Sequence, residues 1–123
     1  MKEANLLHRS NCPIATSLDF VGDKWTLVIV RDMLNGKSRF NDFLESPERI
    51  TATVLTKRLE AMVKHELVVK KEYVSRPPRY QYLLTEKGQA LSSIVLAFCE
   101  WGNAQFKQTW KTPEGFGVQQ DIL

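Results

Sequence analysis

The sequence has little cysteine and no long apolar run. Only two cysteines, Cys12 and Cys99, occur in 123 residues, which is too few for a disulfide scaffold. No apolar run approaches the roughly 18 residues that a membrane span needs, and the first residues hold no apolar core of the signal-peptide kind. We therefore expect a cytoplasmic protein with no membrane partner.

Patterns that carry catalysis or bind metals are also missing. The cysteines and the two histidines, His8 and His65, do not pair at the spacing of metal ligands. No nucleophile has a partner base at motif spacing, and no glycine-rich phosphate loop is present. The sequence therefore predicts no catalytic residue, no metal site, no cofactor and no enzymatic activity.

Positive charge is concentrated in the middle of the chain. The net charge is only +3, yet the segment from Arg49 to Arg79 holds eight basic and three acidic side chains. A local basic patch suits a polyanion partner. The charge alone is equally compatible with a solvated surface of mixed sign.

Apolar periodicity and capping residues predict the first elements. A helix should begin at Pro13, where the missing N–H costs nothing, and end at Gly22, with Asp23 capping the next helix. Residues 24–34 are apolar nearly all round and predict a buried central helix, which residues 35–36 end. A short helix over 39–46 should follow.

The second half changes period. Thr51 is a plausible N-cap of a helix from about Ala52 to Glu66, which has an apolar stripe and an opposite polar face. Residues 67–74 and 79–85 are rich in β-branched and aromatic side chains and predict a hairpin, with the turn at 75–78. Thr85 should cap a last helix over about 86–109, followed by a loose tail over 111–123.

This order predicts one α+β domain over residues 1–123 that is mostly helical, a winged helix-turn-helix with a two-stranded wing. The DNA-binding core would span about 13–85. In this fold the helix over 52–66 is the recognition helix, which enters the major groove, and the wing over 75–79 touches adjacent backbone or the minor groove.

Short motifs in a fixed order carry a resemblance. They are Cys-Pro at 12–13, Gly-Asp-Lys-Trp at 22–25, Arg-Phe at 39–40, the spaced Ile-Thr, Val-Leu-Thr and Arg-Leu of 50–59, Pro-Pro-Arg at 77–79, the spaced Tyr, Leu-Thr and Gly of 82–88, and Trp-Gly at 101–102. The ordered set resembles the HxlR-type transcriptional regulators, a bacterial winged-helix family related to the MarR-like repressors. Many members have Pro-Gly before the Ile-Ser/Thr pair, where this chain has Glu48 and Arg49, and proline after Gly36, where it has Lys37.

The recognition helix and the wing carry the predicted DNA contacts. Lysine can reach guanine acceptors, and threonine offers a hydroxyl or a methyl group to bases. The wing arginines bracket two prolines that stiffen the loop, which suits a narrow minor groove. The predicted DNA-binding residues are Thr53, Thr56, Lys57, Arg58, Lys64, Ser75, Arg76 and Arg79. A solvated helix face and a merely charged turn are the alternatives.

The resemblance implies a homodimer built on terminal dimerisation helices, with the main one at about 86–109. That segment has a stripe of large apolar side chains, which are Ile94, Val95, Phe98, Trp101 and Phe106. The alternative is that the stripe is core of a single chain. A two-fold dimer would need a pseudo-palindromic operator with half-sites about one helical turn, or a multiple, apart.

Cys12 is the candidate redox site. If Pro13 is the first helical residue, Cys12 is the N-cap, where free N–H groups and the helix dipole favour its thiolate. His8, Arg9 or Lys24 could add positive charge. Some members of the resembled family respond to oxidants or electrophiles through a cysteine here; the alternative is a small buried side chain. Cys99 matches no such position and is expected to pack.

These features favour a dimeric, sequence-specific DNA-binding transcriptional regulator. Its partners would be double-stranded DNA, a second copy of the chain, and a small-molecule or oxidant effector. A winged helix that docks a protein or RNA, with no specific DNA site, is the other interpretation. The polar, basic face at 53–57 favours DNA, because a protein-docking face would show more exposed aromatic side chains.

Overall fold

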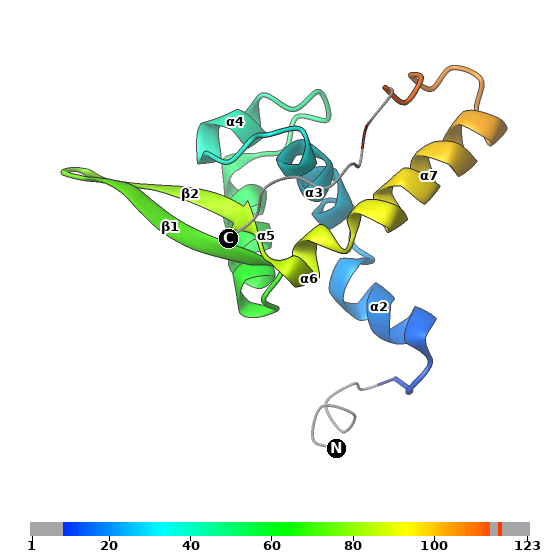
Figure 1. Cartoon of the computed structure of the whole chain (residues 1–123), viewed down its shortest axis with the longest axis horizontal. Coiled ribbons are helices and arrows are strands. Elements are labelled where there is room, and N and C mark those ends of the chain that lie inside the picture. Colours follow the sequence, from blue (N-terminus) through cyan, green and yellow to red (C-terminus); the bar gives the residue numbers. More distant parts are fainter. Residues whose placement is uncertain (1–8, 114–115, 117–123) are drawn as a thin grey trace.

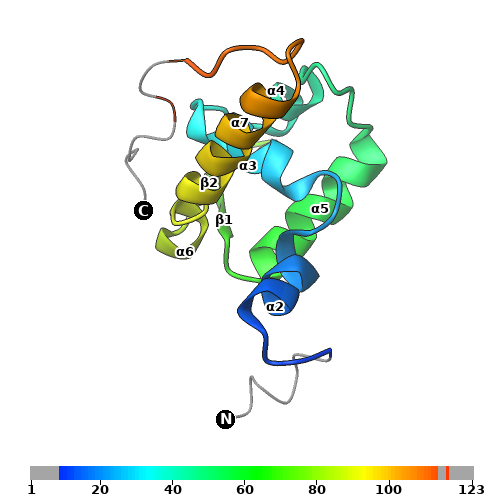
Figure 2. The ribbon, with the colours of Figure 1, turned by 90° about the vertical axis from the view of Figure 1, so that its right-hand side faces the viewer.

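The computed structural model describes residues 9–113 and residue 116. The elements in chain order are α2 (Pro13–Val21), α3 (Thr26–Leu34), α4 (Phe40–Leu44), α5 (Ala52–Lys64), β1 (Val68–Ser75), β2 (Pro78–Leu84), α6 (Glu86–Gln89) and α7 (Ser92–Gln105). Around α3 the short helix α4 and the longer α5 form a body, from which the β1–β2 hairpin projects on one side and α2 and α7 on the other (Figure 1). In the turned view α3 lies between α7 and α5 (Figure 2). The predicted winged helix-turn-helix is confirmed.

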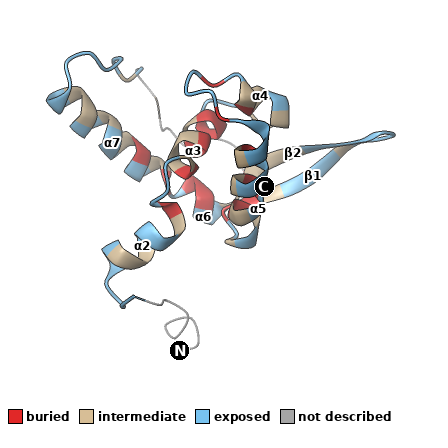
Figure 3. Cartoon of the chain, turned by 180° about the vertical axis from the view of Figure 1, so that it is seen from behind, coloured by how far each residue is buried: buried red, intermediate tan, exposed pale blue. Residues whose placement is uncertain are grey.

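The core lies where α3, α4 and α5 meet. Ile29 of α3, Phe43 of α4 and Leu55 of α5 are each at most 1% exposed. Burial of one such side chain is worth about 1.5–3 kcal/mol. Buried residues gather in this body, whereas the outer hairpin and much of α2 are exposed (Figure 3). The prediction that the helix over 24–34 is buried at the centre is confirmed.

Capping groups fix the helix starts. Pro13 is the first residue of α2, after an extended Cys12, and Gly22 caps its end. The Asp23 carboxylate accepts hydrogen bonds from the backbone N–H groups of Trp25 (2.9 Å) and Thr26 (3.0 Å), as predicted. Thr51 caps α5, where its hydroxyl accepts from the Val54 N–H at 3.3 Å.

The hairpin is longer than the sequence predicts. Ser75 pairs with Pro78, so only Arg76 and Pro77 form the turn. The register shifts between Glu72 and Val74, which leaves Tyr73 as an extra residue of β1. The wing is also tied to the start of α4, because the Tyr82 N–H donates to the Ser38 carbonyl at 2.7 Å.

The predicted recognition helix and the predicted last helix both differ from the structure. The recognition helix ends at Lys64 rather than 66, because Glu66 has a φ of 63°, which no α-helix continues. The single helix over 86–109 is two helices. The Leu91 N–H donates to the Gly88 carbonyl in a tightened turn between them, and α7 packs against α3.

Close packing at Gly88 anchors this break. A Cβ atom at Gly88 would collide with the Leu67 carbonyl oxygen, so α6 is held tightly to the base of the hairpin. The C-terminal end of α7 is at Gln105, since Phe106 is extended. Of the predicted tail, Thr112 donates to the Asn103 side chain at 3.1 Å, and most of the rest lies outside the described residues.

An ion-pair network holds the turn between α4 and α5. The Arg31 guanidinium of α3 donates to Glu48 at 2.7 and 2.9 Å, to Asp32 at 2.9 and 3.0 Å, and to the Ser46 hydroxyl at 2.9 Å. Arg49, which stands where many members of the resembled family have glycine, has a φ of 62°, a left-handed conformation that glycine adopts without steric cost. The turn therefore keeps its shape without that glycine, and the Glu48 ion pair ties it to α3.

Neutralising Glu48 should destabilise the protein in a pH-dependent way. The Arg31 hydrogen bonds lower the pKa of Glu48 from 4.5 to about 2. A lowered pKa gives stability that is complete above pH 4.5 and is lost as the pH falls through about 2. We expect Glu48→Gln to lower the free energy of unfolding by about 1 kcal/mol at pH 7, because the pair is partly exposed.

Calorimetric unfolding from pH 7 to pH 2.5 checks this. The gap in Tm between wild type and Glu48→Gln should narrow below pH 4.5. Glu45→Gln is the matched control, since Glu45 is exposed and has no ion pair among the described residues. A gap of constant size across the range would contradict the linkage.

Candidate nucleic-acid interface

The buried side of α5 fixes which side chains it exposes. Leu55, Leu59 and Met62 are at most 2% exposed, and residues three and four apart share one helix face. The opposite face is consequently open, and it carries Thr53, Thr56, Lys57, Glu60 and Lys64, all exposed. The Thr56 hydroxyl donates to the Ala52 carbonyl at 2.9 Å, so it keeps only its acceptor capacity for a partner.

Arg58 differs from the other predicted contacts on α5. It is half-buried, and its guanidinium lies 3.5 Å from the Asp23 carboxylate. The Asp23 carboxylate partly neutralises the Arg58 charge, in the contact between α5 and the segment before α3. Arg58 is therefore less suited to bind a phosphate than the exposed lysines are.

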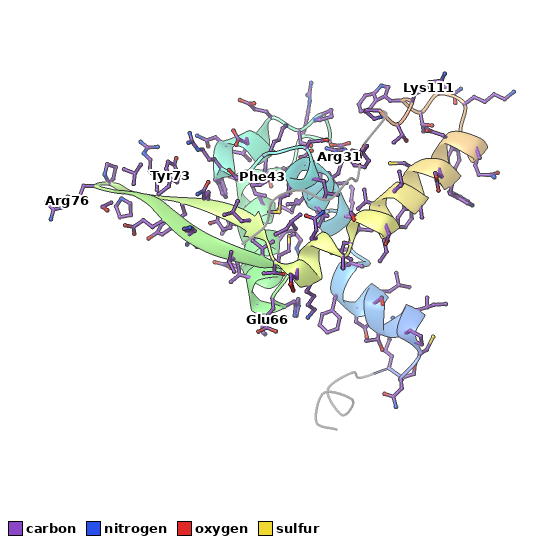
Figure 4. The ribbon with its side chains drawn as sticks, viewed as in Figure 1. Arg31, Phe43, Glu66, Tyr73, Arg76 and Lys111 are labelled. Atoms are coloured by element: carbon purple, nitrogen blue, oxygen red, sulfur yellow. The ribbon has the colours of Figure 1, made fainter. Side chains whose placement is uncertain are left out.

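The wing presents the other predicted contacts. Ser75, Arg76 and Arg79 are exposed. Figure 4 shows Arg76 at the tip of the hairpin, far from the helical body. Lys70 lies over the Tyr80 ring, 4.3 Å from its centroid, which orders its ammonium group on the wing.

The seven arginines fall into two groups, those with a carboxylate partner and those without one among the described residues. Arg9, Arg31 and Arg58 each have a carboxylate partner. Within the part of the chain that the structure describes, Arg39, Arg49, Arg76 and Arg79 have none within 4.0 Å. The arginines without carboxylate partners thus lie around α4, α5 and the hairpin.

Two residues of this surface were missed by the sequence reasoning. Arg39 lies with its guanidinium 4.5 Å from the ring centroid of Tyr73, across a cleft of about 520 Å³ between α4 and the hairpin. The Arg-Phe pair at 39–40 was the available signal, although the sequence could not show that Tyr73 lies opposite it.

The predicted apolar stripe of α7 is largely open. Ile94, Phe98, Trp101 and Phe106 are 40–60% exposed, but Val95 is 6% exposed and belongs to the core of this chain. The prediction was therefore wrong to group Val95 with an open face, because Val95 packs in the hydrophobic core of this chain. Ile14 and Leu18 of α2, which the sequence analysis did not assign, join Ile94 and Phe98 around a hollow of about 460 Å³.

Cys12 lies in the open at the start of α2. It is the N-cap, and its side chain is exposed, so it is not buried inside this chain. The Ala15 and Ile14 backbone N–H groups, with the Arg9 charge, lower the pKa of the Cys12 thiol. Lys24 instead lies 5.7 Å from the Trp25 ring centroid, and His8 falls outside the described residues. Cys99 is half-buried on α7.

In residues 9–113 and 116, no three His, Cys, Asp or Glu side chains gather as a metal site would require. None of the described helices is long and apolar enough to cross a membrane.

Comparison with known proteins agrees with this arrangement. The family model of HxlR-like helix-turn-helix proteins matches residues 20–110. The HTH-type transcriptional regulator YybR of Bacillus subtilis (strain 168) is 36% identical over 97 residues, which are 79% of this chain and 78% of YybR. YdeP of the same organism, also an HTH-type transcriptional regulator, is 34% identical over 91 residues, 74% of this chain and 71% of YdeP.

A solved structure gives the same result. The redox regulator HypR in its reduced form matches with a TM-score of 0.70 at 36% identity, over 76% of this chain and 92% of HypR. The names of these matched proteins describe them as transcriptional or redox regulators. This chain belongs to the HxlR-like helix-turn-helix family of DNA-binding transcriptional regulators.

Proposed function

We propose that this protein is a dimeric, sequence-specific transcriptional regulator that inserts α5 into the major groove of its operator. One observation carries the proposal: α5 buries one face in the core and leaves a polar, basic face open beside an arginine-bearing wing. The 13 residues of α5 make a helix about 20 Å long. The diameter of an α-helix with its side chains, about 10–12 Å, fits the width of the major groove, about 12 Å.

On α5, Thr53, Thr56 and Lys57 lie nearest the N-terminal end, where recognition helices reach base edges. Lys64 lies at the other end and suits a backbone phosphate. The wing, with Ser75, Arg76 and Arg79, would reach the adjacent backbone or minor groove, because the hairpin projects well beyond the helical body (Figure 1).

The alternative, a winged helix that docks a protein or RNA, is less well supported. The most exposed large apolar side chains lie on α2 and in and after α7, not on α5. A docking surface on α5 would lack the aromatic anchors that protein interfaces use. The alternative remains an outcome of the binding experiment below.

Removal of the Lys57 charge should weaken sequence discrimination. Genomic fragments that the protein selects supply the operator, and Kd is measured for that duplex and for a scrambled one. One base contact is worth about 1–3 kcal/mol, so Lys57→Ala should reduce the ratio of the two Kd values about tenfold. Lys107→Ala, an exposed lysine beyond α7, is the control and should keep the wild-type ratio. Equal binding of wild type to every duplex would refute the proposal.

The dimer would form through α2 and α7. Ile14 is 71%, Leu18 52% and Phe98 59% exposed, and a second copy that covered these side chains would remove this apolar surface from water. Two subunits on one operator also bind as a unit, which raises affinity without any new contact.

A charge in that surface should separate the subunits. We expect Phe98→Asp to be monomeric at micromolar concentration by sedimentation, and to bind the operator at least tenfold more weakly. Trp110→Asp is the matched control, since Trp110 is 76% exposed but lies outside the α2–α7 hollow. A monomeric wild type would contradict the dimer.

Cys12 would make the regulator responsive to an oxidant or electrophile. HypR is described as a redox regulator, with reduced and oxidised structures of similar likeness to this chain. The exposed, thiolate-favouring position of Cys12 supports the same class of response. A thiolate that attacks a peroxide breaks the O–O bond, becomes a sulfenic acid and releases the second oxygen as hydroxide or alkoxide.

Modification of Cys12 should change DNA affinity. Cys12 should react with a thiol reagent faster than Cys99 does, because Cys12 is more exposed and its thiolate is favoured. Mass spectrometry at successive times measures the two rates. The modified protein should then bind the operator with a changed Kd, and Cys12→Ser should not respond. Unchanged binding after complete modification would leave Cys12 without a sensing role.

A further inference from the structure

The cleft between α4 and the hairpin brings together charged and aromatic side chains, of which only Arg79 is among the predicted DNA contacts. On one wall are the start of α4 and the residue before it, and on the other are both strands of the wing. The lining residues are Arg39, Phe40, Asn41, Asp42, Tyr73, Pro78, Arg79, Tyr80 and Tyr82. Figure 4 shows Tyr73 partway along the hairpin, on the side nearer α4.

The Arg39 guanidinium is held in this cleft without being neutralised. It stacks on the Tyr73 ring, 4.5 Å from the centroid, and Tyr73 is the extra residue of the β1 irregularity, the kind of position that redirects a side chain. The backbone of Arg39 pairs with Gln81, which fixes the distance between the two walls. A stacked guanidinium loses less freedom when it binds a ligand.

The charge of the cleft is positive. Among the described residues no carboxylate lies within 4.0 Å of the charged groups of Arg39 or Arg79. Asp42 lines the same cleft, but its Oδ2 accepts from the backbone N–H groups of Arg39 (3.1 Å) and Ser38 (3.4 Å). A guanidinium group without a carboxylate partner can bind a phosphate group through paired, charge-assisted hydrogen bonds, and this cleft is lined by two such groups.

The cleft borders the open face of α5. A neighbouring hollow of about 230 Å³ shares Phe40 and Tyr82 with it and continues to Thr56, Glu60 and Lys70. A duplex that lies on α5 would therefore pass its backbone along this edge, between the recognition helix and the wing.

We propose that Arg39, seated on Tyr73 and assisted by Arg79, binds a backbone phosphate of the DNA strand that borders the groove occupied by α5. This proposal rests on the proposed function, because it requires α5 to lie on a duplex. Such a contact carries no sequence information itself; it sets the register in which α5 meets the bases.

The test compares variants on the operator and on the scrambled duplex between 50 and 200 mM salt. Arg39→Ala should weaken binding to both duplexes by a similar factor, about tenfold. It should also reduce the slope of log K against log salt by about one, as expected for one lost phosphate contact. Lys107→Ala should keep the wild-type slope. Arg39→Gln is a second variant if the alanine form unfolds.

Two substitutions of Tyr73 test the stack, since neither changes a charge. Tyr73→Phe keeps an aromatic ring under the guanidinium and should bind DNA as wild type does. Tyr73→Ala removes the ring and should weaken binding to both duplexes severalfold, with thermal unfolding as the check on folding.

The outcomes separate the two proposals. If Arg39→Ala keeps the wild-type affinity and salt slope while Lys57→Ala narrows discrimination, the phosphate site is overturned and the proposed function stands. If Arg39→Ala lowers only the operator affinity, Arg39 reads a base and the phosphate assignment is wrong. If the wild type distinguishes no duplex, the proposed function fails, and the phosphate site fails with it.

Discussion

Leu55, Leu59 and Met62 of α5 pack into the core with α3 and α4, and the rest of the interface depends on that packing. A rotation of α5 that offered a different face to a partner would expose these side chains, at about 1.5–3 kcal/mol each. The same constraint keeps Thr53, Lys57 and Lys64 in solvent. The Arg31–Glu48 ion pair acts just before α5, where it holds the turn that sets the helix start. The proposed binding face is thus a consequence of the core.

The part of the chain proposed for dimerisation is joined to α5 by specific contacts. Phe20 of α2 meets His65, at the end of α5, edge-on at a centroid distance of 4.6 Å. Asp23, just after α2, accepts from the backbone N–H groups that begin α3 and lies 3.5 Å from Arg58 of α5. The helix α2, which begins after Cys12, therefore contacts the C-terminal end of α5 and also carries part of the proposed subunit contact.

Local signals predicted the elements well, and tertiary contacts explain what they missed. Pro13, Thr51 and Thr85 act within their own turns, so the sequence alone indicated those helix starts.

The break between α6 and α7 depends on Gly88 meeting the Leu67 carbonyl, a contact across the hairpin that helical periodicity does not record. Arg39 and Tyr73 likewise meet only because the hairpin folds back beside α4 and β1 has an extra residue. Val95 and Phe98 are both apolar residues of the last helix, so the sequence alone does not separate them. The packing of α7 against α3 buries Val95 and leaves Phe98 exposed.

Hydroxyl-radical footprinting of the dimer on a selected operator tests the central claim most directly. The account predicts two protected backbone segments related by two-fold symmetry, about one helical turn or a multiple apart, each extending from the edge of a major groove into the neighbouring minor groove. Uniform protection that does not depend on sequence, or a single asymmetric footprint per bound protein, would contradict it.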